Sequence, residues 1–147
     1  MKILLTLLIT LLSSLSFGQK KYPTKDFRNP LDIPSVLAGT FGELRSNHFH
    51  AGIDIKTQQK EGLNVYAVAD GYVSRIKIAL WGYGKVIYIN HPNGYTSVYA
   101  HLSKFENGIE TYVKKIQYKK ESYETGNIFP KKGEILVKKG QIIAFTG

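Results

Sequence analysis

Four histidines and one aspartate are the side chains of this sequence that could bind a metal ion and move protons. The histidines are His48, His50, His91 and His101, and all of them fall within residues 48–101 of the 147-residue chain. Three residues separate His50 from Asp54, and imidazole and carboxylate groups are both zinc ligands. His101 follows later, so the sequence suggests a metal site with a further histidine for acid–base chemistry. On spacing alone this motif is weak.

The spacing of His50 and Asp54 restricts the backbone between them. In an extended strand, residues four apart are separated by roughly 13 Å, which is too far to share an ion bound at ~2 Å. A helix would bring them to ~6 Å, but Gly52 and the β-branched Ile53 disfavour a helix. We therefore predict a bend at Ala51-Gly52, with His50 before it and Asp54 entering the next strand.

Other candidate residues also have structural interpretations. His48 could join His50 in a His-x-His pair of ligands, but its aromatic and apolar neighbours favour a structural histidine. His91 directly precedes a Pro-Asn-Gly turn, which favours a surface turn residue. Asp70 is explained by an Asp-Gly turn, while Trp81 and the tyrosines could lie in the core or on the walls of a groove.

Alternating apolar residues and turn signals predict two β-hairpins. Their strands and turns are 65–69 and 72–78 around Asp70-Gly71, and 86–91 and 95–102 around Pro92-Asn93-Gly94. Because side chains alternate along a strand, we expect His101 to share a face with Ser97 and Tyr99. Such an aromatic and hydroxylic face could form the wall of a groove.

A different composition begins after Ser103. Residues 104–140 hold nine Lys and five Glu, and we interpret about 104–133 as a solvated, Lys-rich insertion. Within it, Asn107 to Glu110 resembles a capping box that opens one short helix. The apolar face of this helix would consist of Ile109, Tyr112, Val113 and Ile116. Beyond the insertion, residues 134–137 and 141–145 are predicted strands.

Three regions divide the chain. Residues 1–18 are typical of a signal peptide, with Lys2 before an apolar run and a Ser16-Phe17-Gly18 cleavage site. Residues 19–40, which contain three prolines, are expected to form an extended N-terminal arm. Residues 41–147 would form a single domain. The predicted location is therefore outside the cytoplasm, periplasmic or extracellular, and no transmembrane segment is expected after cleavage of the signal.

Composition narrows the chemistry further. The sequence has no cysteine, which excludes disulfides, thiol nucleophiles and thiolate metal sites, so that any metal must be bound by His and carboxylate side chains. The formal net charge is +9, which would attract a polyanion such as nucleic acid, anionic lipid or an acidic wall polymer. Export argues against nucleic acid as the partner.

Several motifs in a fixed order resemble the lysostaphin-type zinc metallopeptidases. They are His-Ala-Gly-Ile-Asp at 50–54, Gly-x-x-Val-Tyr-Ala-Val-Ala-Asp-Gly-x-Val at 62–73, Gly-Tyr-Gly-x-x-Ile-x-Ile-x-His-x-x-Gly-Tyr at 82–95, Tyr-Ala-His-Leu-Ser at 99–103, and Val-x-x-Gly-Gln-x-Ile-Ala at 137–144. The resemblance covers about residues 41–147, apart from the Lys-rich insertion. A set of ordered motifs is far more specific than any one of them.

This resemblance implies a mainly β fold, an antiparallel sheet with an open groove, and hydrolysis of peptide bonds in bacterial peptidoglycan. It implies that His50 and Asp54 bind Zn²⁺, with the metal polarising a water and the scissile carbonyl. It also implies that His101 is catalytic, orienting the water or stabilising the oxyanion. Peptidoglycan peptides are accordingly the expected partners.

One feature of the family pattern is missing. The family's third zinc ligand comes from a late His-x-His motif, which is absent here, and we expect it beyond Gly147 in a longer gene product. The 147-residue chain would then be a truncated peptidase with weak or no activity. The alternative is a non-catalytic module of the same fold that binds a partner or wall peptide and regulates another hydrolase. The retention of His50, Asp54 and His101 favours the enzyme.

Overall fold

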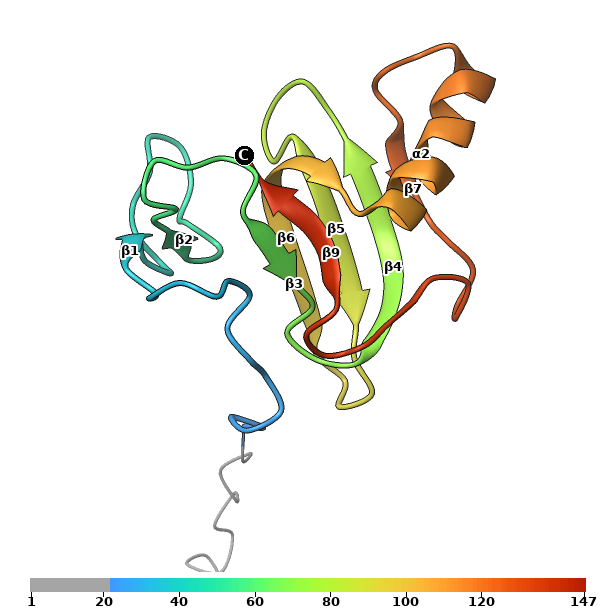
Figure 1. Cartoon of the computed structure of the whole chain (residues 1–147). Helices are drawn as coiled ribbons and strands as arrows, with labels where there is room; N and C mark the ends of the chain where they lie inside the picture. Colours follow the sequence, from blue (N-terminus) through green and yellow to red (C-terminus); the bar gives the residue numbers. More distant parts are fainter. Residues whose placement is uncertain (1–21) are drawn as a thin grey trace, which may run out of the picture.

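The computed structural model of the chain describes residues 22–147, so the predicted signal peptide lies outside the described residues. Among the described residues, no helix has both the length and the apolar character needed to cross a bilayer. The elements form a curled antiparallel sheet, one helix and a small lobe at the side of the sheet (Figure 1). The predicted mainly β fold is confirmed.

Seven strands make up the main sheet. They are β3 (Asn64–Tyr66), β4 (Gly71–Ile78), β5 (Lys85–Asn90), β6 (Thr96–Phe105), β7 (Gly126–Ile128), β8 (Leu136–Val137) and β9 (Ile142–Thr146). Their order is β3-β9-β6-β5-β4-β7, with β8 also pairing with β4, and every pairing is antiparallel. The small lobe contains β1 (Leu37–Gly39) and β2 (Asp54–Ile55), which pair with each other.

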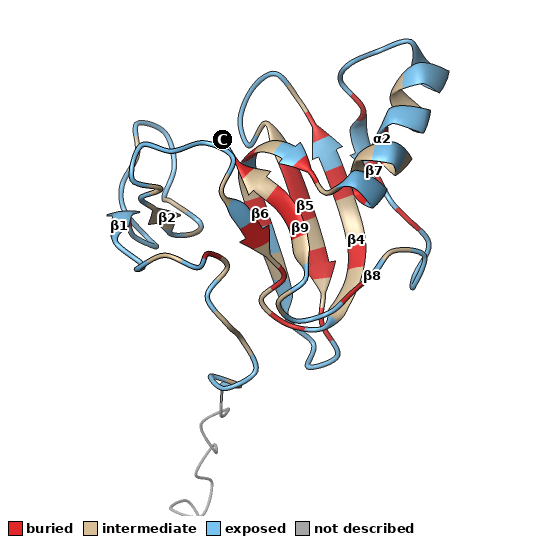
Figure 2. Cartoon of the chain, viewed as in Figure 1, coloured by how far each residue is buried: buried red, intermediate tan, exposed pale blue. Residues whose placement is uncertain are grey.

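Apolar side chains from the long central strands form the core. Along β4, Val73, Ile76 and Ile78 are buried, and Ile87 and Ile89 of β5 lie beside them. The buried residues concentrate on the central sheet and are nearly absent from the small lobe (Figure 2). Burial of such side chains contributes roughly 1.5–3 kcal/mol each, so the sheet is the part of the molecule that carries its stability.

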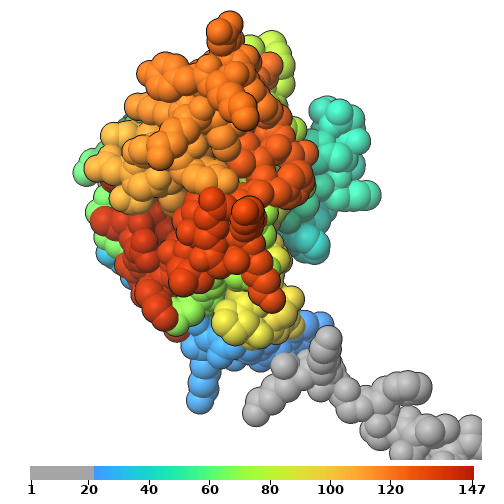
Figure 3. All heavy atoms as spheres, turned by 90° about the vertical axis from the view of Figure 1, so that its right-hand side faces the viewer, coloured from blue at the N-terminus to red at the C-terminus, as the bar shows by residue number. Residues whose placement is uncertain are grey.

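The predicted helix is confirmed as α2 (Asn107–Lys120), although its cap differs from the prediction. The N-cap is Glu106, whose carboxylate accepts the Gly108 N–H at 2.9 Å. Ile109 and Val113 are buried in the core, and Tyr112 and Ile116 pack against it. The Lys-rich segment is therefore solvated on one side only, because its apolar face is part of the core. In Figure 3 the helix and the segment after it cover one side of the molecule.

One of the two predicted hairpins is wrong. The second is confirmed, since β5 and β6 pair from Asn90 and Thr96 outward. In the first, β3 pairs with β9 instead of β4. Gly71 lacks a Cβ because β4 approaches β5 closely there: a Cβ would lie 2.4 Å from the Asn90 carbonyl oxygen. Gly71 therefore allows the close approach of β4 to β5, and the Asp70-Gly71 pair does not connect two strands of a hairpin.

The N-terminal arm lies along the outer edge of β3. Arg28 N–H donates to the Val68 carbonyl and Tyr66 N–H donates to the Pro30 carbonyl, both at 2.9 Å. The Arg28 guanidinium also stacks over the Tyr66 ring at 4.4 Å, and Leu31 is buried in the core. Backbone groups that would otherwise form an open sheet edge are therefore partly paired.

Candidate metal and catalytic site

The small lobe places His50 and Asp54 side by side. The predicted bend is confirmed at Gly52, and Asp54 begins β2. Upstream, His50 N–H donates to the Glu43 carbonyl and Gly42 N–H donates to the His50 carbonyl, each at 2.8 Å. These bonds fix the backbone of His50 against the preceding turn. As a result the His50 Nε2 lies 3.2 Å from Asp54 Oδ1.

Hydrogen bonds orient both side chains. The His50 Nδ1 lies 3.0 Å from the Thr40 carbonyl, which can only accept, so Nδ1 donates there, and Nε2 is the ring nitrogen that faces Asp54. The other Asp54 oxygen, Oδ2, accepts from the Arg45 guanidinium at 2.8 Å. This pairing leaves Oδ1 free to act beside Nε2. A carbonyl partner behind a histidine is the arrangement that metal-binding imidazoles commonly use.

A glycine makes room for this cluster. Gly39 is opposite Asp54 in the β1–β2 pair, and a Cβ at that position would lie 2.5 Å from both the Arg45 guanidinium and Asp54 Oδ2. Any larger residue would displace the ion pair. Arg45, Thr40 and Gly39 were missed by the sequence reasoning, because nothing in their local sequence reveals that they meet Asp54.

The arrangement fits part of a zinc site. In a tetrahedral site with bonds of about 2.0 Å, two ligand atoms lie roughly 3.3 Å apart, close to the observed separation of Nε2 and Oδ1. The donor set, a neutral imidazole and a carboxylate, is also suited to zinc. Within residues 22–147, no three His, Cys, Asp or Glu side chains gather closely enough to bind a metal ion together. The separation of His50 Nε2 and Asp54 Oδ1 is therefore compatible with two adjacent ligand positions of a zinc site.

His101 lies on a bulge of β6 rather than in regular strand. Lys85 pairs with Leu102 and Ile87 with Tyr99, so β6 has one more residue than β5 over this stretch. His101 has a positive φ of 55°. Its N–H donates to the Tyr83 carbonyl at 3.0 Å, and its own carbonyl accepts from Gly147 N–H at 3.1 Å. The bulge turns the imidazole outward and fixes its backbone.

This bulge overturns the predicted face of His101. Tyr99 is 7% exposed and belongs to the core, whereas His101 is exposed. The strict alternation that would place them together fails because the extra residue shifts the side-chain direction by one position. The His101 ring instead meets the edge of the Tyr83 ring, with centroids 6.2 Å apart. Within the described residues, no hydrogen bond or ion pair joins His101 to His50 or Asp54.

The two remaining histidines, His48 and His91, differ in burial. His48 is exposed, and its Nδ1 lies 2.6 Å from the Asn47 side chain. His91 was predicted as a surface turn residue, and this is wrong: it is 6% exposed. Its Nδ1 donates to the Asp70 carbonyl at 2.8 Å, and its Nε2 lies 2.8 Å from the Ser97 hydroxyl.

The N-terminal arm contributes to the burial of His91. Phe27 packs edge-on against the His91 ring, with centroids 5.6 Å apart. Phe27 is distant from His91 in the sequence, so this contact could not be predicted from the residues around His91. The adjacent network also holds Tyr99, whose hydroxyl lies 3.0 Å from the Ser97 hydroxyl. Burial raises the pKa of the Tyr99 phenol above its ordinary value.

The fold and these side chains define a β-rich domain with a histidine–carboxylate pair at one side. Comparison with known families is consistent with this. Residues 48–128, more than half of the chain, match the model of Peptidase family M23, and the chain belongs to this family. The resemblance noted from the sequence motifs is thereby confirmed.

Curated relatives match a shorter stretch. The chain is 42% identical over 62 residues to proteins named "DD-carboxypeptidase/endopeptidase Mpg" from Neisseria meningitidis serogroup B and Neisseria gonorrhoeae. The matched stretch is 42% of this chain and 14% of each relative. No solved structure matches the chain significantly.

Proposed function

We propose that this chain is the peptidase domain of an exported, zinc-dependent cell-wall hydrolase that cleaves peptide bonds in bacterial peptidoglycan. Membership of Peptidase family M23 supports peptidase chemistry. The printed activity of the Neisseria relatives, a DD-carboxypeptidase and endopeptidase, supports wall peptides as the substrate. The signal-like sequence of residues 1–18 supports export.

The observation that carries the proposal is the 3.2 Å approach of His50 Nε2 to Asp54 Oδ1. These two groups would hold the zinc ion, and the Thr40 carbonyl and Arg45 guanidinium would keep both in position. When bound, zinc supplies a Lewis acid that polarises a carbonyl and lowers the pKa of water. Arg45 neutralises part of the Asp54 charge, so its role is to orient the carboxylate without occupying Oδ1.

His101 would hold or move a proton during peptide hydrolysis. Its exposed ring can reach a substrate, and its backbone is tied to Tyr83 and Gly147 at both the N–H and the carbonyl. A fixed, exposed imidazole suits general acid–base catalysis, because histidine is the side chain that most often transfers protons in enzymes. The Tyr83 ring lies beside the imidazole in a T-shaped arrangement.

Zinc binding to single variants tests this assignment. His50→Ala and Asp54→Ala should each weaken zinc binding at least about tenfold in competition with a chromophoric chelator. His101→Ala should leave zinc binding nearly unchanged and suppress release of peptidoglycan fragments by a chain that carries the complete ligand set. His48→Ala is the matched control, because His48 is an exposed neighbour of the proposed ligands.

Two results would contradict the proposal. Equal loss of zinc in His101→Ala and His50→Ala would show that His101 is a ligand. Full zinc binding in Asp54→Ala would remove Asp54 from the site. Binding of wall peptides without cleavage, even with the ligand set complete and zinc bound, would favour the non-catalytic module.

A further inference from the structure

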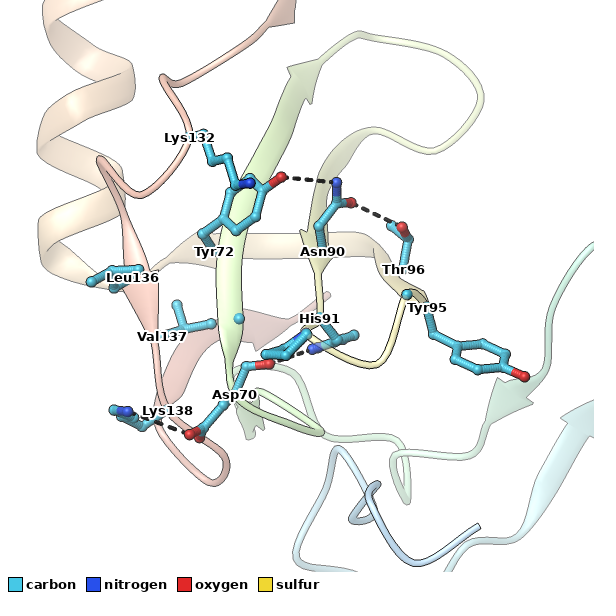
Figure 4. Close-up of a pocket in the computed structure, with 13 residues that line it drawn as sticks. Asp70, Tyr72, Asn90, His91, Tyr95, Thr96, Lys132, Leu136, Val137 and Lys138 are labelled. Atoms are coloured by element: carbon cyan, nitrogen blue, oxygen red, sulfur yellow. Dashed lines mark hydrogen bonds and ion pairs between the residues drawn. The ribbon is translucent and has the colours of Figure 1, made fainter. Parts of the chain in front are cut away.

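A second polar site lies on the main sheet. Paired positions in β8, β4, β5 and β6 place four side chains in one cross-strand row, namely Leu136, Tyr72, Asn90 and Thr96. The row lines an open pocket of about 570 Å³, and Figure 4 shows three of these side chains joined across it by hydrogen bonds. Lys132, from the loop before β8, lines the same pocket.

The hydrogen bonds within the row occupy the carbonyl oxygen of Asn90 and leave N–H and O–H donors free. The Asn90 Oδ1 accepts from the Thr96 hydroxyl at 2.9 Å and from the Ser74 hydroxyl at 3.0 Å. The Asn90 amide donates to the Tyr72 hydroxyl at 3.3 Å. Among the described residues, the Tyr72 O–H has no acceptor of its own, and one Asn90 N–H also remains. These free donors suit a ligand that offers acceptor atoms.

The charges in the pocket favour an anion. Asp70 is the one acidic residue among those that line it, and it is already paired: its Oδ1 accepts Lys139 N–H at 2.7 Å and its Oδ2 lies 3.3 Å from Lys138 Nζ. Lys132 has no ion-pair partner among the described residues. Its ammonium is consequently the uncompensated charge of the pocket.

The apolar side chains and the volume of the pocket favour a ligand larger than a single inorganic anion. Leu136 is 67% exposed, and Val137, Pro92 and Tyr95 also line the pocket. An inorganic ion would fill a small part of this volume, which lies within the range of small-molecule sites. Apolar walls beside fixed donors are suited to a ligand with both carboxylate and methyl-bearing parts.

We propose that this pocket binds the carboxylate end of a short peptide, with Lys132, the Tyr72 hydroxyl and the Asn90 amide facing the carboxylate and Leu136 against the adjoining side chain. This goes beyond the proposed function, since the pocket residues are distinct from His50, Asp54 and His101. It rests on the proposed function only for the source of the peptide. The pocket would bind its ligand without zinc.

Binding of a defined dipeptide tests the inference. N-acetyl-alanyl-alanine and its C-terminal amide are titrated into the isotopically labelled chain in the presence of EDTA, and amide chemical shifts are followed. The free acid should bind about tenfold or more tightly than the amide, because charge-assisted hydrogen bonds are lost in the amide. Shifts should appear at Tyr72, Asn90 and Lys132.

Two variants and one control separate the site from general charge attraction. Lys132→Gln should weaken binding of the acid several-fold while leaving binding of the amide nearly unchanged, and Tyr72→Phe should weaken binding of the acid more than that of the amide. Lys119→Gln, which removes an equal charge from the last turn of α2, should change nothing. Lys132 is exposed, so its substitution leaves the fold intact even if Tyr72→Phe does not fold.

The proposal fails if acid and amide bind equally, if Lys119→Gln weakens binding as much as Lys132→Gln, or if the acid gives no shifts at these residues. Tighter binding of inorganic phosphate than of the acid would also overturn it, since the peptide would then be the wrong ligand. Each of these results is obtained without metal. Failure here is thus distinguishable from failure of the zinc site.

Discussion

The small lobe and the main sheet hold their side chains in place by different means. In residues 37–55 the one buried residue is Gly39, and His50 and Asp54 are positioned by hydrogen bonds and charge. In the sheet, Phe105 and Ile87 are fully buried and are positioned by packing. The proposed metal ligands therefore belong to the more weakly packed of the two regions, which we expect to open locally without unfolding of the core.

The largest effect should come from the core. Phe105→Ala removes a fully buried side chain and should lower the free energy of unfolding by about 3–5 kcal/mol, through lost burial and a remaining cavity. Urea denaturation followed by circular dichroism measures this. Phe129→Ala is the control: this side chain is 67% exposed, so its loss should change the free energy by less than about 0.5 kcal/mol. Similar losses of unfolding free energy in Phe105→Ala and Phe129→Ala would contradict the expected difference between a buried and an exposed side chain.

A smaller effect is expected from the lobe. Arg45→Ala removes a half-exposed ion pair with Asp54 and should change the free energy of global unfolding by less than about 1 kcal/mol. Amide hydrogen exchange at Asp54 and Ile55 should nevertheless accelerate, because the lobe loses one of its few fixed contacts. Arg75→Ala serves as the control, since Arg75 stacks on Tyr88 of the sheet. A global loss comparable to that of Phe105→Ala would show that the lobe and sheet unfold together.

The smallest effect concerns Asp70 and pH. Its pKa is lowered from 3.8, first by the hydrogen bond from Lys139 N–H and then by Lys138. A carboxyl group with a depressed folded-state pKa stabilises the fold above its unfolded pKa, and this contribution disappears as pH falls through the folded pKa. Asp70→Asn should therefore lower the urea midpoint slightly at pH 7, and the difference should disappear as the pH falls below 3.8 and through the lowered folded-state pKa of Asp70.

The order of these causes gives a second test of the Asp70 prediction. Lys138→Gln removes the ion pair but keeps the Lys139 backbone hydrogen bond, so it should retain most of the pH-dependent difference. If Lys138→Gln abolished that difference while Asp70→Asn still lowered the midpoint at pH 7, the ion pair would be the dominant cause. The hydrogen bond from Lys139 N–H would then be the smaller cause of the lowered Asp70 pKa.

Local patterns in the sequence predicted local structure well. The period of Ile109, Tyr112, Val113 and Ile116 located the inner face of α2, and Asn93-Gly94 marked the β5–β6 turn. The bend between His50 and Asp54 followed from ligand spacing and from residues that disfavour a helix. In each of these cases the determining interactions lie within about ten residues, where propensity and periodicity operate.

Interactions between segments distant in the chain were not predicted from the sequence. Glycine and aspartate at 70–71 resembled a hairpin turn, but the partner of β3 is β9. The bulge at His101 carries no glycine to signal its positive φ. Of the candidate site, His50 and Asp54 meet as expected, whereas Arg45 and Gly39 join them only through the β1–β2 pairing. Whether His101 acts in catalysis stays a prediction.

The pairing of β3 with β9 also sets the order in which the protein can fold. Leu63 N–H donates to the Thr146 hydroxyl at 3.0 Å across 83 residues, and Thr146 N–H returns a bond to the Leu63 carbonyl at 2.9 Å. A ribosome delivers the N-terminal residues first, so β3 cannot pair until residues 142–146 have been synthesised. Pairing of segments so far apart in sequence costs conformational entropy before the new contacts stabilise the chain, and we expect this cost to make folding slow. A nascent chain stalled before residue 142 should consequently remain sensitive to protease, even though β4, β5 and β6 are already present.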